Sequence, residues 1–205
     1  MPVYKQCIST CSQITVSAGY PTYPGGGAHG GYDTQHKCNW LAYSPKSGTI
    51  VTAHHWQGGT SGNDSWGNYI VVAIDEEPGN YYLAAHFTAQ THSVSEHLDA
   101  GQLIGTQGQT GNATGIHTHW EYWVGGQSTA YRRDPAPMLG LPSVTGPAQV
   151  FDVEWDTDVP GPGPGPGPGP GPGPGPGPDP DPGPSWDKIP VWLLFKMAER
   201  GRLNG

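Results

Sequence analysis

The clearest strand signal in the chain is Thr118-His-Trp-Glu-Tyr-Trp-Val124, which is rich in β-branched and aromatic residues. Similar short runs lie upstream at residues 48–53, 69–74 and 81–87, each bounded by clusters of Gly, Asn, Pro and Ser. No segment before residue 160 has a convincing helical period. The sequence therefore predicts a mainly β fold, with an antiparallel β domain and long loops over residues 13–140.

The composition changes sharply after residue 159. Glycine and proline alternate strictly from Pro160 to Pro178, and the bias continues to Pro184. Because proline fixes φ while glycine restores backbone freedom, this run is expected to be a flexible linker that joins no core. We therefore expect a folded domain at residues 1–159, a Gly-Pro-rich linker at 160–184 and a separate segment at 185–205.

The last segment, residues 185–205, is predicted to form a short helix. Ser185 or Asp187 can cap its start, and Gly201 suits its end. The residues between 191 and 197 are too apolar for a helix that stands alone. The helix would either pack back on the main domain or dock on a protein partner, and the long linker favours docking.

The charge balance argues against nucleic acid as a partner. Asp and Glu number 17 against 9 Lys and Arg, which gives a net charge of -8. Binding to a phosphate backbone requires clustered Lys and Arg. The chain also has 9 histidines, and histidine is a common metal ligand and general base, so the composition directs attention to metal chemistry.

Membrane and export signals are not recognisable. No stretch approaches the roughly 18–20 apolar residues of a transmembrane helix, and residues 1–12 lack a basic region followed by a long apolar core. We expect neither a transmembrane segment nor a signal peptide. The cysteines Cys7, Cys11 and Cys38 leave at least one thiol unpaired, so we expect buried thiols or at most one disulfide.

Two clusters carry groups that can bind a metal, His29-Gly-Gly-Tyr-Asp33 and His117-Thr-His119. Side chains at i and i+2 of a strand point to the same face, so both members of the second pair are expected to enter one groove. Two imidazoles and one carboxylate leave a fourth position open, which is the arrangement of catalytic zinc. The glycines at residues 25–27 predict a close backbone approach near this site.

The clusters belong to a longer pattern. The first follows Tyr23-Pro-Gly-Gly-Gly-Ala, and the second follows Gly108-Gln-Thr-Gly and Asn112-Ala-Thr-Gly. In this order, from about residue 23 to residue 139, the chain resembles the lysostaphin-type (LytM-like) zinc metalloendopeptidases, which act on peptidoglycan. The resemblance implies that His29, Asp33 and His119 bind Zn²⁺. It further implies that His117 and His86 are catalytic histidines and that Tyr23 contacts the reacting oxygen.

The function that the resemblance implies is hydrolysis of the peptide cross-links of bacterial peptidoglycan, as in a cell-wall lytic enzyme or a phage-derived lysin. Such a protein would act at the bacterial cell wall, outside the cell or carried on a virion. Two alternatives remain open. One is a relative without catalysis that binds peptidoglycan or activates another hydrolase; the other is a structural component of a phage particle.

Overall fold

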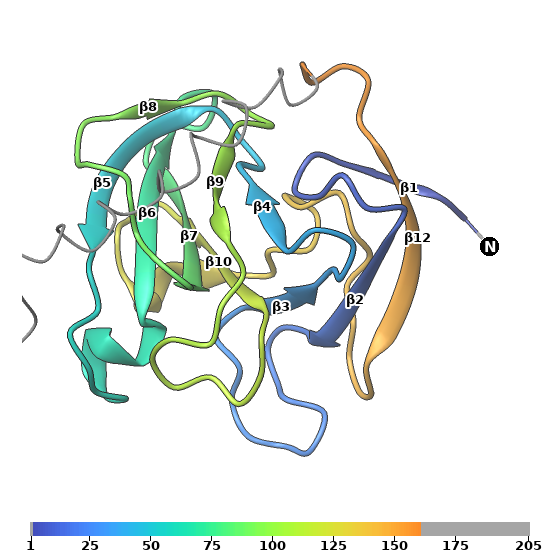
Figure 1. Cartoon of the computed structure of the whole chain (residues 1–205), viewed down its shortest axis with the longest axis horizontal. Coiled ribbons are helices and arrows are strands. Elements are labelled where there is room, and N and C mark those ends of the chain that lie inside the picture. Colours follow the sequence, from blue (N-terminus) through green and yellow to red (C-terminus); the bar gives the residue numbers. More distant parts are fainter. Residues whose placement is uncertain (1, 161–205) are drawn as a thin grey trace, which may run out of the picture. The chain divides into compact units, whose positions relative to one another are not determined.

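The computed structural model describes residues 2–160, and this part of the chain is mainly β (Figure 1). Apart from Pro160, the predicted linker at 160–184 and the predicted helix at 185–205 lie outside the described residues. The strands in chain order are β1 (Tyr4–Gln6), β2 (Gln13–Ala18), β3 (Tyr32–Gln35), β4 (Leu41–Tyr43), β5 (Gly48–His54), β6 (Asn68–Ile74), β7 (Asn80–Phe87), β8 (His97–Leu98), β9 (Leu103–Thr106), β10 (Thr118–Val124), β11 (Arg132–Arg133) and β12 (Gln149–Trp155). Two short 3-10 helices, η1 (Gly62–Trp66) and η2 (Thr129–Tyr131), lie in loops.

A single ten-stranded sheet dominates the fold. Its strands run in the order β1-β12-β2-β3-β10-β7-β6-β5-β8, with β11 paired to β10, while β4 and β9 form a small second sheet. Every pair is antiparallel except β1 with β12, which is parallel. The central strand β10 lies between β3 and β7 (Figure 1). It therefore pairs with one strand from the N-terminal part of the chain and one from the middle.

The predicted fold class is confirmed. The run at 118–124 is β10, and the runs at 48–53, 69–74 and 81–87 are β5, β6 and β7, each longer by one residue. The predicted range of 13–140 was too narrow at both ends. Strand β12 follows residue 140, and it joins β1 and β2 at one end of the main sheet.

The two faces of the sheet have different neighbours. Ile70, Tyr82 and Trp120 point into the large core, whereas Tyr69, Leu83 and Trp123 form a smaller apolar cluster on the other face. Because side chains alternate along a strand, His119 shares the face of Trp123 and lies opposite the large core. One face of the sheet therefore packs on the large core, and the opposite face carries His119 and can form a functional site.

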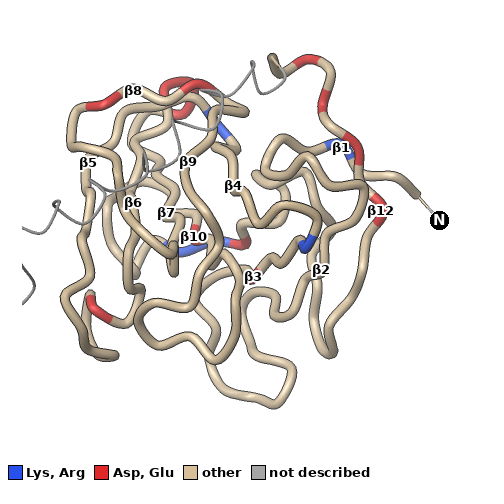
Figure 2. The backbone as a smooth tube through the Cα atoms, viewed as in Figure 1, with Lys and Arg blue, Asp and Glu red and all other residues tan. Residues whose placement is uncertain are grey.

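One disulfide and scattered charges complete the fold. Cys11 and Cys38 form the disulfide and Cys7 is a buried free thiol, which agrees with the expectation of at most one disulfide. Figure 2 shows the few Lys and Arg residues scattered over the described part of the chain. Between residues 2 and 160, none of the helical segments has the length and apolar character needed to cross a bilayer.

Candidate metal centre

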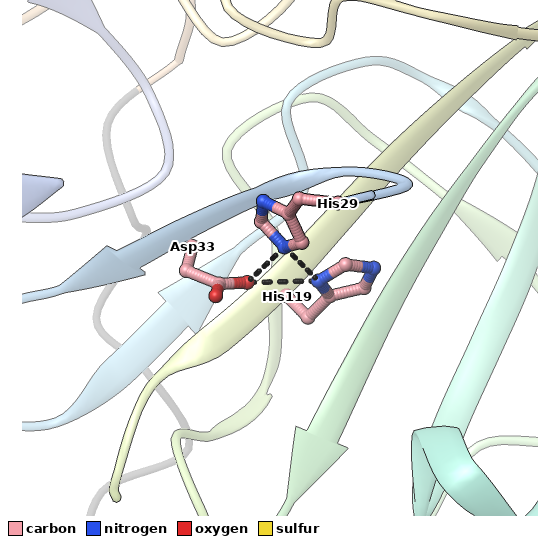
Figure 3. A group of neighbouring side chains, drawn as sticks. All are labelled: His29, Asp33 and His119. Carbon is pink, nitrogen blue, oxygen red and sulfur yellow. Dashed lines mark hydrogen bonds and ion pairs between the residues drawn. The ribbon is translucent and has the colours of Figure 1, made fainter. Parts of the chain in front are cut away.

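Three side chains converge at the start of β10. The Nε2 atom of His29 lies 3.2 Å from Oδ1 of Asp33 and 3.2 Å from Nδ1 of His119, and the last two atoms are 2.8 Å apart. Figure 3 shows the three groups pointing toward one another, and all three are buried. Asp33 and His119 are directly opposite each other in the β3–β10 register, while His29 comes from the loop before β3.

The close contact of these elements depends on Gly31. A Cβ there would lie 2.2 Å from the carbonyl oxygen of Trp120 and 2.6 Å from Cε1 of His119, so no other residue fits without moving β3 away from β10. The prediction of a close approach at residues 25–27 is wrong, since a Cβ at any of these positions would meet nothing within 4 Å. Gly26 and Gly27 instead supply the positive φ angles, 91° and 90°, of a tight loop.

The donor set and its spacing fit a metal ion. Zinc ligands lie about 2.0–2.2 Å from the ion in a tetrahedron, so neighbouring ligand atoms should be about 3.3 Å apart. Two of the separations, 3.2 Å each, are close to this value, and the third, 2.8 Å between Asp33 and His119, is about 0.5 Å shorter. The remaining ring nitrogens are held in place: Nδ1 of His29 donates to the carbonyl of Gly19 at 2.9 Å, and Nε2 of His119 donates to Glu121 at 3.2 Å. These bonds leave Nε2 of His29 and Nδ1 of His119 to face an ion.

Two more histidines lie beside this cluster. The ring centroids of His86 and His117 are 4.8 Å apart, and Nε2 of His117 is 3.6 Å from Oδ1 of Asp33. Each ring donates its Nδ1 proton to a backbone carbonyl at 2.8 Å, Thr110 for His86 and Gly115 for His117. Both rings therefore leave Nε2 as the free nitrogen, which can accept a proton.

An irregularity in β7 brings His86 to this face. Simple alternation from Tyr82 and Ala84, which face the large core, would direct His86 into the same core. The β6–β7 register shifts near Asn68, and His86 has a φ of 67°, so the alternation reverses at this point. Phe87 then enters the core, and the His86 ring lies 5.7 Å from that of His119.

Burial and hydrogen bonding act in opposite directions on the pKa values of Asp33 and His119, whereas burial and neighbouring charges both lower the pKa of His86. Burial would raise the pKa of Asp33, but hydrogen bonds from His119 and His29 hold it far below its usual range. Burial would lower the pKa of His119, but its hydrogen bonds to Asp33 and Glu121 raise it to about 9, so a metal ion at Nδ1 would take the place of the proton that bonds Asp33. Burial, together with the neighbouring His119 and His117, lowers the pKa of His86 to about 3. The carboxylate is thus charged and His86 is neutral at pH 7.

Tyr23 lies at the rim of the cluster. Its ring stacks on the His29 imidazole with centroids 4.2 Å apart, and the residue remains 45% exposed. Backbone hydrogen bonds between Tyr23 and the glycines at 26 and 27 close the loop that carries it. The structure therefore places the tyrosine next to the candidate ligands, with its ring open to a bound molecule.

A small cleft of about 120 Å³ opens beside the cluster, and its walls include residues that the sequence did not indicate. It is lined by Tyr23, His29, Gly30, Ser65, Trp66, Asn112, His119, Glu121 and Arg132. Glu121 could have been found from its position two residues after His119 on the same strand face. No comparable signal exists for Arg132, which reaches the cleft from β11.

The other histidines do not join the cluster. His54 pairs with Asp64, His92 with Glu96 and His97 with Asp75, while His36 is buried elsewhere. His36 lines a larger hollow of about 300 Å³ beside the disulfide. That hollow lacks any group of three metal-binding side chains, because within residues 2–160 only His29, Asp33 and His119 have ligand atoms this close together.

Residues 27–131 match peptidase family M23. The chain belongs to this family. It is 32% identical over 125 residues to lysostaphin of Staphylococcus simulans and 29% identical over 127 residues to the glycyl-glycine endopeptidase ALE-1 of Staphylococcus capitis. Each alignment covers 59% of this chain but only 24% and 32% of the relatives, so the chain spans about a quarter to a third of their length.

Comparison with a solved structure agrees with the family assignment. The catalytic domain of the antimicrobial peptidase lysostaphin from Staphylococcus simulans superimposes with a TM-score of 0.51 at 30% identity, covering 60% of this chain and 90% of that domain. The predicted resemblance to lysostaphin-type peptidases is confirmed. The family match contains His29, Asp33, His86, His117 and His119, whereas Tyr23 lies before it.

Proposed function

We propose that this M23 peptidase is a zinc-dependent endopeptidase that hydrolyses peptide bonds in bacterial peptidoglycan. The observation that carries the proposal is the triangle of His29, Asp33 and His119, whose separations of 3.2, 3.2 and 2.8 Å lie within about 0.5 Å of the spacing of zinc ligands. Two imidazoles and one carboxylate leave a coordination position open for a reactant, as catalytic zinc sites require.

His29, Asp33 and His119 would hold the ion. Zn²⁺ bound there would supply Lewis-acid polarisation of the scissile carbonyl and a lowered pKa for the attacking water. His117 would accept a proton at Nε2 and later return it to the leaving amine, because its Nδ1 already donates to Gly115. His86, whose Nε2 is also free, would orient the water by accepting a hydrogen bond.

Tyr23 would complete the site by donating its hydroxyl proton to the oxyanion. Burial raises the pKa of Tyr23, so the hydroxyl stays protonated at neutral pH and can donate. The stack on His29 restricts the ring to the side of the cleft where that ligand lies. An exposed ring at this position can also contact the peptide on either side of the cleaved bond.

Peptide cross-links of the bacterial cell wall are the proposed substrate, and the cell wall is the proposed place of action, outside the cell or on a virion. Lysostaphin is described as an antimicrobial peptidase, and ALE-1 is named a glycyl-glycine endopeptidase. By analogy, we propose that this chain also cleaves a peptide bond within the cross-link. Residues 1–159 would form the peptidase domain, 160–184 a linker, and 185–205 a docking segment for a protein partner.

The experiment that tests the proposal is digestion of purified peptidoglycans with different cross-link chemistry. Mass spectrometry of the products should reveal new amino and carboxyl termini within one kind of cross-link, and His117→Ala should generate none. If the zinc-loaded protein binds peptidoglycan without releasing new termini from any preparation, it is a binding or activating relative. A structural role in a phage particle would in turn be supported if the protein copurified with virions.

A further inference from the structure

A buried carboxylate stands directly behind the ligand histidine. Glu121 follows His119 by two residues on the same face of β10, and its side chain is completely buried. Its two oxygens accept hydrogen bonds from the rings of three neighbours, His119 at 3.2 Å, Trp66 at 3.0 Å and Trp123 at 2.7 Å. A carboxylate with this many donors cannot rotate freely, so it presents a fixed acceptor to the outer nitrogen of His119.

Arg132 supplies the charge that balances this carboxylate. Its Nε and Nη2 atoms each donate to one oxygen of Glu121 at 2.6 Å, a two-point contact that fixes the plane of the carboxylate. The guanidinium passes over Gly30, where a Cβ would lie 2.3 Å from its Cζ. Gly30 is the residue directly after the candidate ligand His29. Because it has no side chain, the Arg132 guanidinium can pass over it and reach Glu121 beside His119.

We propose that Arg132 and Glu121 form a positioning pair that holds His119 with Nδ1 directed toward the metal. This inference rests on the proposed zinc peptidase function. Glu121 fixes the ring by accepting its Nε2 proton, and the two hydrogen bonds from Arg132 hold the Glu121 carboxylate in its plane and position. Removing one member of a buried pair leaves an uncompensated charge, so loss of the guanidinium would let Glu121 move and would release His119 from its ligating orientation.

The test measures the affinity of the full chain for zinc by competition with a chromophoric chelator. The variant is Arg132→Gln, and the matched control is Arg133→Gln, the next residue of β11, whose guanidinium makes one hydrogen bond within the described part of the chain, to the carbonyl of Arg132. Arg132→Gln should weaken zinc binding about tenfold or more, within the range for residues that orient ligands. Arg133→Gln should bind zinc as the wild type does.

A double-mutant cycle separates positioning from a general loss of packing. If Arg132 acts through Glu121, then Glu121→Gln alone weakens zinc binding, and adding Arg132→Gln changes it no further. If Arg132→Gln alone folds poorly, the comparison of Glu121→Gln with the double variant still tests the inference, because neither protein contains the unpaired buried carboxylate; a further loss of zinc affinity in the double variant would contradict it.

Two results would overturn the inference: an Arg132→Gln protein that is folded and binds zinc as tightly as Arg133→Gln, or effects of the two substitutions that simply add. Failure of the proposed function is distinguishable, because in that case the wild-type chain itself would not bind zinc.

Discussion

Substitution of Gly31 tests how the backbone builds the metal centre. In Gly31→Ala, the new Cβ would lie 2.2 Å from the Trp120 carbonyl oxygen, whereas ordinary contact begins near 3.4 Å. Strands β3 and β10 would have to separate by roughly 1 Å. Forcing an extra carbon into a packed interior typically costs about 1–3 kcal/mol, which corresponds to about 2–12 °C in melting temperature for a domain of this size.

The same displacement should also weaken metal binding. Asp33 and His119 are opposite each other across these two strands, and their ligand atoms are 2.8 Å apart. Functional groups tolerate displacements of only about 0.5 Å from their working geometry, so we expect the affinity for zinc to fall at least about tenfold. A thermal melt followed by circular dichroism and a chelator competition measure the two effects.

Gly25→Ala is the matched control. A Cβ at residue 25 meets nothing within 4 Å, so this variant should melt within about 2 °C of the wild type and bind zinc normally. The reasoning is refuted if Gly31→Ala and Gly25→Ala have the same melting temperature and the same affinity for zinc.

Three further predictions concern other parts of the chain. His117→Ala should retain zinc by metal analysis but lose about 100- to 10,000-fold in turnover; loss of the metal would make it a ligand instead. Burial lowers the pKa of His36 below 6.5, so its stabilising contribution is present above pH 6.5 and is lost as the pH falls through the folded-state pKa. In urea titrations of chelator-treated proteins, the free energy of unfolding should therefore fall less for His36→Gln than for the wild type between pH 7.5 and pH 5.5. An equal fall in the two proteins would contradict this prediction. Deleting residues 160–205 should change the melting temperature by less than about 5 °C and leave hydrolysis of small peptides unchanged, and a larger drop would mean that the segment packs on the domain.

Much of the site could be predicted from local sequence patterns. His117 and His119 share a strand face because their spacing of two matches the strand period, and the structure brings both rings close to Asp33. His29 joins these residues from the loop before β3, in which Gly26 and Gly27 have positive φ angles. The sequence placed the close backbone contact at residues 25–27 instead of Gly31, because it does not reveal which glycine meets a facing strand.

The structural features that the sequence did not predict depend on contacts between residues far apart in the chain. His86 was matched to the family pattern, but strict alternation would have directed it into the core, and only the register shift beside it explains its orientation. Arg132 reaches Glu121 through the pairing of β11 with β10, and Gly30 leaves room for it. Strand β12 pairs with β1 and β2, which lie at the opposite end of the described chain. None of these relations has a periodic signature in the sequence.

The most direct test of the account is the dependence of wall hydrolysis on metal at the His29, Asp33 and His119 centre. Release of new amino groups from peptidoglycan should be measured for the purified chain, for the chain stripped by a strong chelator, and for the stripped chain reloaded with one equivalent of zinc. We predict activity, loss of activity and recovery, with about one zinc bound per chain and neither binding nor recovery in His119→Ala. Undiminished hydrolysis by the stripped protein, or recovery in His119→Ala, would contradict the account.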